Sequence, residues 1–151
     1  DLMIWLFGPV DKVFASTEKR ALNVNTGDVV TARWQHSSGL NTQITAILKT
    51  PYYQRVTIWG ENGWVELVDS SHPDTPGPSF MKMVMNDGTI KEEKYEWTDT
   101  VSANIHNFID SIQGKNKYLF TDVEKFQNIS VLEDIYKSSL STQNEQVESF
   151  N

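Results

Sequence analysis

The chain has 151 residues, with 13 Lys and Arg against 20 Asp and Glu, and a formal net charge of −7. Its cations are scattered, which argues against nucleic acid or an anionic membrane as a partner, because phosphate recognition needs clustered Lys and Arg. It has no cysteine, which excludes a disulfide framework and thiolate chemistry and suits the cytoplasm. The length predicts a single domain, residues 1–151, with a sizeable core.

The chain opens with six apolar residues, Leu2–Phe7, followed by Gly8 and Pro9. We expect a helix that ends there, because Gly caps helices and Pro cannot continue them. The run is too short to cross a bilayer, which takes about 20 apolar residues, and it lacks the features of a signal peptide. A helical turn without a polar face should be buried on all sides, so we expect a fragment of a larger protein.

Alternating apolar and polar residues predict strands at 10–20, 29–36 and 43–49. Asn62-Gly63 between two β-rich runs, 55–60 and 64–68, indicates a hairpin in which both residues tolerate positive φ. A proline-rich loop at 69–79 precedes a second hairpin, formed by 80–85 and 89–97.

The hydrophobic period then becomes helical over Val101–Ile112, and Gly114 ends that helix. Thr121 and Glu124 form a capping box, which predicts a helix running to about Leu140. Its expected inner side comprises Val123, Phe126, Ile129, Leu132, Ile135 and Tyr136, and "QVESF" (146–150) is a candidate last strand. The order predicts an α+β fold, a predominantly antiparallel open sheet of about six strands covered on one face by helices.

The chemistry-bearing residues form no self-sufficient catalytic site. The sequence has no glycine-rich phosphate loop, so we expect no cofactor-binding residue in this chain. Its three histidines, His36, His72 and His106, lack metal-ligand spacing, and no metal site is expected. His36 shares a strand face with Trp34 and is a candidate for lining a cleft, although a strand-end histidine is more often solvated.

Two further features are candidates for binding. Tyr52 and Tyr53 follow a proline at a strand entrance and are suited to present a phenol to a polar ligand. At most one of the two should contact a ligand, because adjacent strand residues point to opposite faces. The alternative is that both tyrosines only pack against a loop. Met81, Met83 and Met85 form one face of a strand whose other face is also apolar. A strand that is apolar on both faces indicates either a dimer interface or burial within the monomer.

Taken in order, several segments resemble the C-terminal domain of the glucose-fructose oxidoreductase / inositol dehydrogenase / rhizopine catabolism (Gfo/Idh/MocA) family. The similar segments are "DLMIWLFGPVDKV", "GDVVTARWQHSSG", "RVTIWGENGWVEL", "NIHNFIDSIQGK" and "TDVEKFQNISVLEDIYKSSLSTQNEQV". The resemblance covers nearly the whole chain.

The resemblance implies a cytoplasmic parent enzyme with a preceding Rossmann domain that binds NAD or NADP. "DL" at Asp1-Leu2 matches the end of an Asp-x-x-x-His-x-x-Asp-Leu motif, whose catalytic His would lie before Asp1. Alone, the chain is therefore expected to be inactive. Tyr52 is the nearest match to a substrate-contacting tyrosine of some members, with Tyr53 beside it, while "EWTDTVSANIHNF" departs from those members' later pattern.

The resemblance thus implies a substrate-binding and dimerisation domain, with Tyr52, Tyr53 and His36 as substrate-binding candidates and no catalytic residue. The partners would be a small-molecule, sugar-like substrate and a second copy docked near Met81, Met83 and Met85. A stand-alone α+β module that binds a ligand without catalysis is the alternative. A purely structural dimerisation domain is the third possibility.

Overall fold

A computed structural model describes residues 1–141 of the chain. These residues form two compact units, the first made of Asp1–Lys49 with the segment from Phe120 onward, and the second of Thr50–Leu119. The strand expected at 146–150 lies outside the described residues. Within residues 1–141, no helix is both long and apolar enough to cross a membrane.

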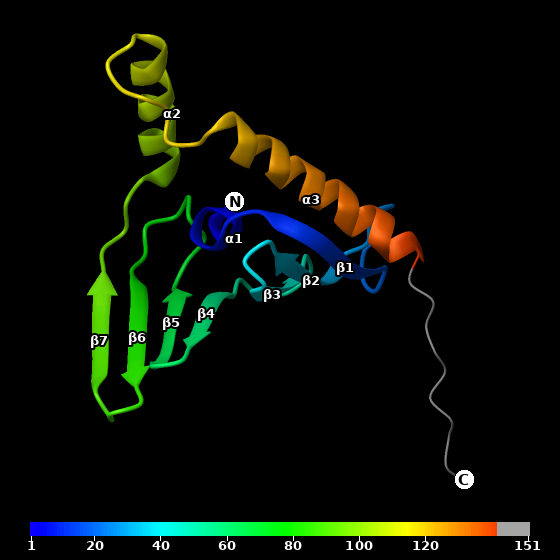
Figure 1. Ribbon diagram of the computed structural model, residues 1–151, viewed down its shortest axis with the longest axis horizontal. Helices are drawn as coiled ribbons and strands as arrows, with labels where there is room; N and C mark the ends of the chain where they lie inside the picture. Colours follow the sequence, from blue (N-terminus) through cyan, green and yellow to red (C-terminus); the bar gives the residue numbers. More distant parts are fainter. Residues whose placement is uncertain (142–151) are drawn as a thin grey trace. The chain divides into compact units, whose positions relative to one another are not determined.

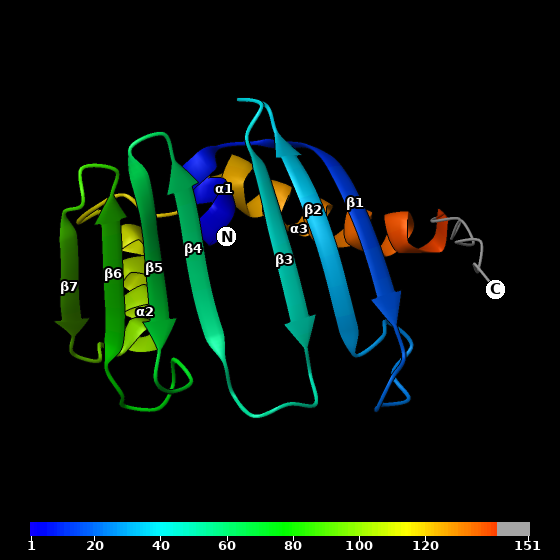
Figure 2. The ribbon, with the colours of Figure 1, turned by 90° about the horizontal axis from the view of Figure 1, so that it is seen from below.

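The first unit is a three-stranded antiparallel sheet with two helices. Its elements are α1 (Leu2–Phe7), β1 (Val10–Glu18), β2 (Val29–His36), β3 (Asn41–Ile47) and α3 (Asp122–Ser141), with strand order β1-β2-β3. Both helices lie on the same face of this sheet (Figures 1 and 2). That face carries the apolar residues of the strand alternation, while Phe14 on the other face is 49% exposed.

The core of the first unit lies between α1, α3 and the covered sheet face. It consists of five buried apolar residues, Ile4, Ala15, Ala32, Trp34 and Val131. The indole Nε1 of Trp34 is buried and has no hydrogen-bond partner among the described residues. The strands expected from the alternation are confirmed, and their period of two places Ala15, Ala32 and Trp34 on one face.

Helix α3 presents a different face to the sheet from the one expected. Val131 is buried and Ile135 is half-buried, but Phe126 and Ile129 are 76% and 66% exposed. The helix packs on β1, where Ser138 Oγ accepts a 2.9 Å hydrogen bond from the Ala15 N–H. Among the described residues β1 is an outer strand of its sheet, and the N–H groups on the outer side of such a strand need partners from elsewhere. Most of the expected inner side is therefore exposed, and only Ile135 of it packs against the core.

Helix α1 is also less enclosed than expected. Ile4 is buried, whereas Leu2, Trp5 and Leu6 are 46%, 57% and 41% exposed. Burial on all sides is therefore wrong for the described chain. The helix itself is confirmed and ends at Gly8, whose N–H donates to the Ile4 carbonyl at 2.8 Å.

The second unit contains a four-stranded antiparallel sheet and one helix. Its elements are β4 (Gln54–Gly60), β5 (Gly63–Asp69), β6 (Ser79–Met85), β7 (Ile90–Tyr95) and α2 (Thr100–Ile112), with strand order β4-β5-β6-β7 (Figure 2). The α+β class and the antiparallel pairing are confirmed. The described residues form seven strands in two sheets, rather than about six in one.

The first hairpin of this sheet is confirmed, but its turn differs in detail. Gly60 pairs with Gly63, so the two turn residues are Glu61 and Asn62, and Asn62 does not have positive φ. Gly63 has φ +153° and lies against β6, where an added Cβ would come within 2.2 Å of the Val84 carbonyl oxygen. The glycine is thus required by its close approach to the neighbouring strand.

Helix α2 is tied to its own flanking segments. Asp99 caps it by accepting a 2.9 Å hydrogen bond from the Ser102 N–H. On the return loop, the Tyr118 hydroxyl donates to Asn104 at 2.8 Å and its ring makes an edge contact with Phe108. None of the helix residues is buried.

Candidate functional site

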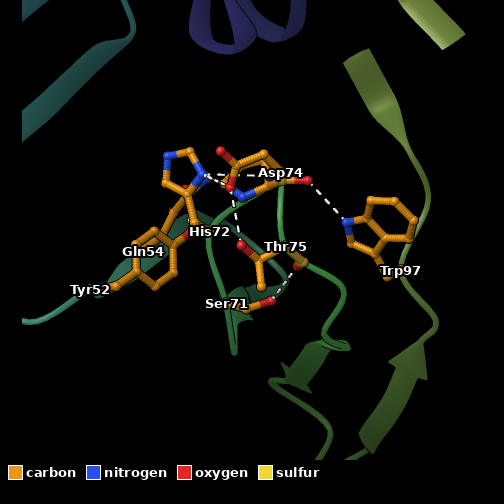
Figure 3. A network of polar contacts seen from close by, with 8 residues as sticks. Tyr52, Gln54, Ser71, His72, Asp74, Thr75 and Trp97 are labelled. Carbon is orange, nitrogen blue, oxygen red and sulfur yellow. Dashed lines mark hydrogen bonds and ion pairs between the residues drawn. The ribbon is translucent and has the colours of Figure 1, made fainter. Parts of the chain in front are cut away.

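The loop between β5 and β6 is a turn that holds a histidine and an aspartate side by side. Residues 72–75, His-Pro-Asp-Thr, form a β-turn in which the Thr75 N–H donates to the His72 carbonyl at 2.8 Å. Proline fits the second position of such a turn, because its ring fixes φ near −65°. The turn brings the His72 and Asp74 side chains together, two residues apart (Figure 3).

The two side chains are joined by a hydrogen bond between His72 Nδ1 and Asp74 Oδ1. This bond holds the pKa of the Asp74 carboxyl below its usual range, and the Thr75 hydroxyl, 3.2 Å from the same oxygen, adds to the effect. Asp74 is thus ionised at neutral pH and can only accept hydrogen bonds. The proton of the shared bond therefore resides on His72 Nδ1.

Tyr52, two residues before the start of β4, packs against the imidazole of His72. Its ring meets the His72 ring edge-on, with centroids 5.7 Å apart, and its hydroxyl donates to Gln54 Oε1 at 2.8 Å (Figure 3). Desolvation raises the pKa of the Tyr52 phenol, with a smaller contribution from the Asp69 carboxylate. The phenol therefore stays neutral over the physiological range and remains a hydrogen-bond donor.

The turn is fixed from the other side by Trp97, which follows β7. The indole Nε1–H donates to the Pro73 carbonyl at 2.9 Å (Figure 3). At the base of the loop, the Ser70 N–H and hydroxyl both donate to the Pro78 carbonyl, at 3.1 and 2.6 Å. We call Tyr52, Gln54, His72, Asp74 and Trp97 the His72 cluster. Its members come from three segments: the Tyr52 ring contacts the imidazole of His72, and Trp97 holds the turn through the Pro73 carbonyl.

The three residues predicted from the sequence to bind substrate occupy different surroundings. Tyr52 belongs to the His72 cluster, while Tyr53 is 67% exposed and lies with its ring centroid 6.0 Å from the Arg55 guanidinium carbon. That distance is at the outer limit of a cation–π contact. His36 belongs to the first unit. Its binding of substrate, like that of the two tyrosines, stays a prediction.

His36 is 1% exposed, so the expectation that a strand-end histidine is solvated is wrong here. Its Nδ1 lies 2.8 Å from the Gly8 carbonyl oxygen and its Nε2 3.2 Å from Thr42 Oγ1. Because the Gly8 carbonyl can only accept a hydrogen bond, the ring proton of His36 lies on Nδ1. The Phe7 ring meets the imidazole edge-on, with the ring centroids 5.8 Å apart. A ligand would reach His36 only by displacing the Thr42 hydroxyl.

The first unit has a groove of its own, with a volume of about 460 Å³, between α3 and the start of β1. Val123 and Phe126 give it apolar walls, and the carboxylates of Asp11, Asp122 and Asp134 line it as well. Asp122 pairs with Lys125 at 2.6 Å, yet the lining itself is acidic. An acidic lining opposes an anionic ligand such as a dinucleotide.

The described residues do not fit a bound dinucleotide or a metal ion. In residues 1–141, no strand passes through a glycine-rich turn into a helix, the arrangement that cradles a pyrophosphate. No group of three or more His, Asp or Glu in that range is placed to hold a metal ion.

Sequence reasoning missed the His72–Asp74 pair, although a signal for it was present. The loop was identified as irregular because it holds three of the five prolines. Pro at the second position, between His72 and Asp74, favours a β-turn, and such a turn keeps the residues on either side of the proline close together. The Asp99 cap of α2 was missed in the same way, since Asp three residues before Ser102 is a capping signal.

Comparison with known families gives one match over nearly the whole chain. A family model described as "Oxidoreductase family, C-terminal alpha/beta domain" matches residues 1–148. No curated protein matches the chain.

Solved structures similar to this chain are oxidoreductases, and the likeness is one of fold. They include an oxidoreductase from Agrobacterium radiobacter in complex with NAD+, L-tartaric acid and magnesium (16% identity, TM-score 0.72, covering 93% of this chain and 44% of that one). The WlbA dehydrogenase from Bordetella pertussis, in complex with NADH and UDP-GlcNAcA, is 22% identical (TM-score 0.64; 92% and 39%). UDP-N-acetylglucosamine 3-dehydrogenase GnnA from Acidithiobacillus ferrooxidans is 14% identical (TM-score 0.68; 91% and 42%). The chain spans less than half the length of each of these structures.

Proposed function

The chain belongs to the Gfo/Idh/MocA oxidoreductase family, and from this premise we propose that it is the substrate-binding and dimerisation domain of an NAD- or NADP-dependent dehydrogenase. The observation that carries the proposal is the family match, which spans residues 1–148 and describes a C-terminal domain. Similar structures bound to NADH or NAD+ support a nicotinamide cofactor for the whole protein. Residues 1–151 would be the C-terminal domain of a cytoplasmic enzyme.

In this proposal the dinucleotide is held by a preceding domain, not by the residues described here. The acidic groove of the first unit and the lack of a phosphate loop in residues 1–141 support that division. Exposed apolar side chains add further support, because Trp5 on α1 and Phe126 on α3 are 57% and 76% exposed. Large exposed apolar faces on a folded unit favour a further protein surface that covers them.

The substrate would be a small hydroxyl-bearing molecule, and this chain would form one wall of its pocket. Tyr52 is the foremost binding residue, because its neutral phenol lies beside the imidazole of His72. Tyr53 and His36 are the secondary candidates. The two relatives whose descriptions name UDP-sugars support a sugar-like substrate.

The homo-oligomer would form through the methionine face of the second unit. By cross-strand register, Met81 aligns with Leu67 and Val56, and Met83 with Val65 and Ile58. These two apolar rows have no charged residue on β4, β5 or β6, as the centre of an interface requires. The opposite face carries a charged row made of Glu66, Lys82 and Glu92.

An activity assay on the full-length protein tests the proposal. The reduction of NAD+ and of NADP+ is followed at 340 nm with sugars, polyols and UDP-sugars as the hydride donors, each of which is oxidised to the matching carbonyl compound. Turnover is expected with at least one substrate, and Tyr52→Phe should raise its KM about fivefold, the effect of losing one hydrogen bond. Tyr95→Phe is the matched control at a tyrosine outside the His72 cluster. Absence of turnover with both dinucleotides and every substrate would count against a dehydrogenase.

A further inference from the structure

We propose that His72 is a specificity-determining residue that accepts a hydrogen bond from a hydroxyl group of a neutral polyhydroxylated ligand, with Asp74 as its positioning residue. The inference rests on the proposed function in one respect, since the ligand would be the substrate of the parent enzyme. It names the acceptor atom, His72 Nε2, and the group that assigns the proton of the neutral ring to Nδ1, the Asp74 carboxylate.

The tautomer of His72 follows from its partner. Asp74 is an ionised carboxylate that can only accept, so Nδ1 must donate and Nε2 of the neutral ring carries a lone pair. The Asp74 backbone N–H also lies 3.5 Å from Nδ1. That distance is at the limit for a hydrogen bond, and the much shorter contact with the carboxylate decides the tautomer.

Nε2 is available to a ligand. The His72 side chain is 61% exposed, and Nε2 forms no hydrogen bond with any part of the chain that the structure describes. Figure 3 shows this nitrogen on the side of the ring away from Asp74. An unprotonated imidazole nitrogen accepts hydrogen bonds, and hydroxyl groups are suitable donors.

The surrounding turn holds the acceptor in place before a ligand arrives. Tyr52 orients the ring through its edge contact, Trp97 binds the Pro73 carbonyl, and Thr75 binds the Asp74 carboxylate. Each residue of the His72-Pro73-Asp74 segment thus has a partner from outside the segment. Such preorganisation lowers the entropic cost of binding.

The chemistry of the neighbours selects the ligand class. Asp74 lies beside the imidazole, and the carboxylate of Asp69 acts on Tyr52, so an anionic group would be repelled. Tyr52 and Trp97 are 41% and 36% exposed; Tyr52 offers apolar ring surface beside the imidazole, and Trp97 offers it on the other side of the turn, where it binds Pro73 (Figure 3). A neutral ligand with hydroxyl groups and C–H faces, such as a sugar ring or a cyclic polyol, fits both features.

The test is a ¹⁵N NMR experiment on the full-length protein with labelled histidine, at alkaline pH where imidazoles are neutral. His72 is assigned by its loss in His72→Gln. Its ring is expected in the Nδ1–H form, and Asp74→Asn should shift it toward the Nε2–H form that free histidine prefers. His106 is an internal control of the same tautomer, because its Nδ1 lies 2.7 Å from the Ser102 carbonyl oxygen on the exposed surface of α2.

Glucose, myo-inositol and UDP-N-acetylglucosamine are then added separately. At least one probe should shift His72 Nε2 and leave His106 unchanged, and His72→Gln should weaken its binding about fivefold. Wild-type His72 in the Nε2–H form would overturn the proposal. So would the failure of all three probes to shift it more than His106.

An NADH titration of the same sample separates this inference from the proposed function. If NADH does not bind but a probe shifts the His72 Nε2 signal as expected, the result counts against the dehydrogenase and not against the hydroxyl site. Normal NADH binding with an unresponsive His72 counts against the hydroxyl site alone.

Discussion

The hydroxyl of Ser138 on α3 accepts a hydrogen bond from the backbone N–H of Ala15 on β1, at 2.9 Å. This contact joins residues 123 positions apart in the sequence, and Ala15 is itself part of the core. It lies where α3 packs on β1, the outer strand of the three-stranded sheet among the described residues.

Ser138→Ala should lower the free energy of unfolding by about 1 kcal/mol, because it removes the hydrogen bond between the Ser138 hydroxyl and the Ala15 N–H. Urea unfolding followed by circular dichroism measures the change. Ser139→Ala is the matched control, because the Ser139 hydroxyl bonds the Tyr136 carbonyl of its own helix. An equal loss from both variants would contradict a specific role for the helix–strand bond.

The orientation of α3 can be tested with two adjacent residues. Val131 is 3% exposed and Leu132 is 60% exposed. Val131→Ala should cost about 2 kcal/mol in unfolding free energy, since it removes buried methyl groups and leaves a cavity. Leu132→Ala should change stability by less than about 0.5 kcal/mol. The reverse ranking would restore the helix face predicted from the sequence.

Asp28 should make stability depend on acid pH. Its carboxylate is 2% exposed and accepts hydrogen bonds from the backbone N–H groups of Arg20, Ala21 and Leu22, at 2.6, 2.7 and 2.9 Å. The bond from Arg20 is the main reason that the pKa of Asp28 is lowered from its ordinary 3.8.

Because the folded-state pKa of Asp28 is the lower one, its stabilisation is complete above the ordinary pKa. It is lost as the pH falls below 3.8 toward the folded-state value. Asp28→Asn should lower the urea midpoint at neutral pH, and the gap to wild type should narrow in acid. Asp122→Asn, whose carboxylate is almost fully exposed, should leave the midpoint nearly unchanged. A gap that stays constant with pH would rule out the charged network.

The methionine face predicts the effect of a charge on assembly. Met83→Glu places a carboxylate in the apolar row of Ile58, Val65 and Met83, so a dimer formed there should dissociate. Light scattering coupled to size exclusion measures the mass. Trp59→Glu, on the opposite face at a side chain 75% exposed, should leave the dimer intact. A dimer lost only in Trp59→Glu would place the interface on the other face.

Much of the fold was predictable because local rules and tertiary packing agree in most elements. The hairpin turns, the Gly8 helix end and the Thr121–Glu124 capping box depend on short-range geometry. The capping box is present as expected, with the Thr121 N–H 2.8 Å from Glu124 Oε2 and the Glu124 N–H 3.2 Å from Thr121 Oγ1.

The face of α3 was not predictable, since two stripes of this helix carry apolar residues. The choice between them depends on tertiary packing with residues far away in the sequence: Val131 is buried in the core, and Ser138 accepts from the Ala15 N–H. The buried state of Asp28 escaped notice for a related reason. A turn-forming Asp and a buried, fully bonded Asp look alike in sequence, and only the folded loop places three N–H groups around the carboxylate.

In the candidate site, Tyr52 was predicted and its companions His72 and Asp74 were not. A histidine and an aspartate two residues apart match none of the usual metal-ligand or catalytic spacings, so the sequence alone does not mark His72 and Asp74 as a pair. Their pairing follows from the proline between them and from the turn that it favours.

The central claim is that residues 1–151 supply the substrate wall of a dehydrogenase whose dinucleotide is held by a preceding domain. The most direct test is a fluorescence titration of NADH and NADPH against the full-length protein and against residues 1–151 alone. The account predicts saturable binding of at least one dinucleotide to the full-length protein and none to residues 1–151. Binding by the isolated residues, or its absence from the full-length protein with both dinucleotides, would contradict it.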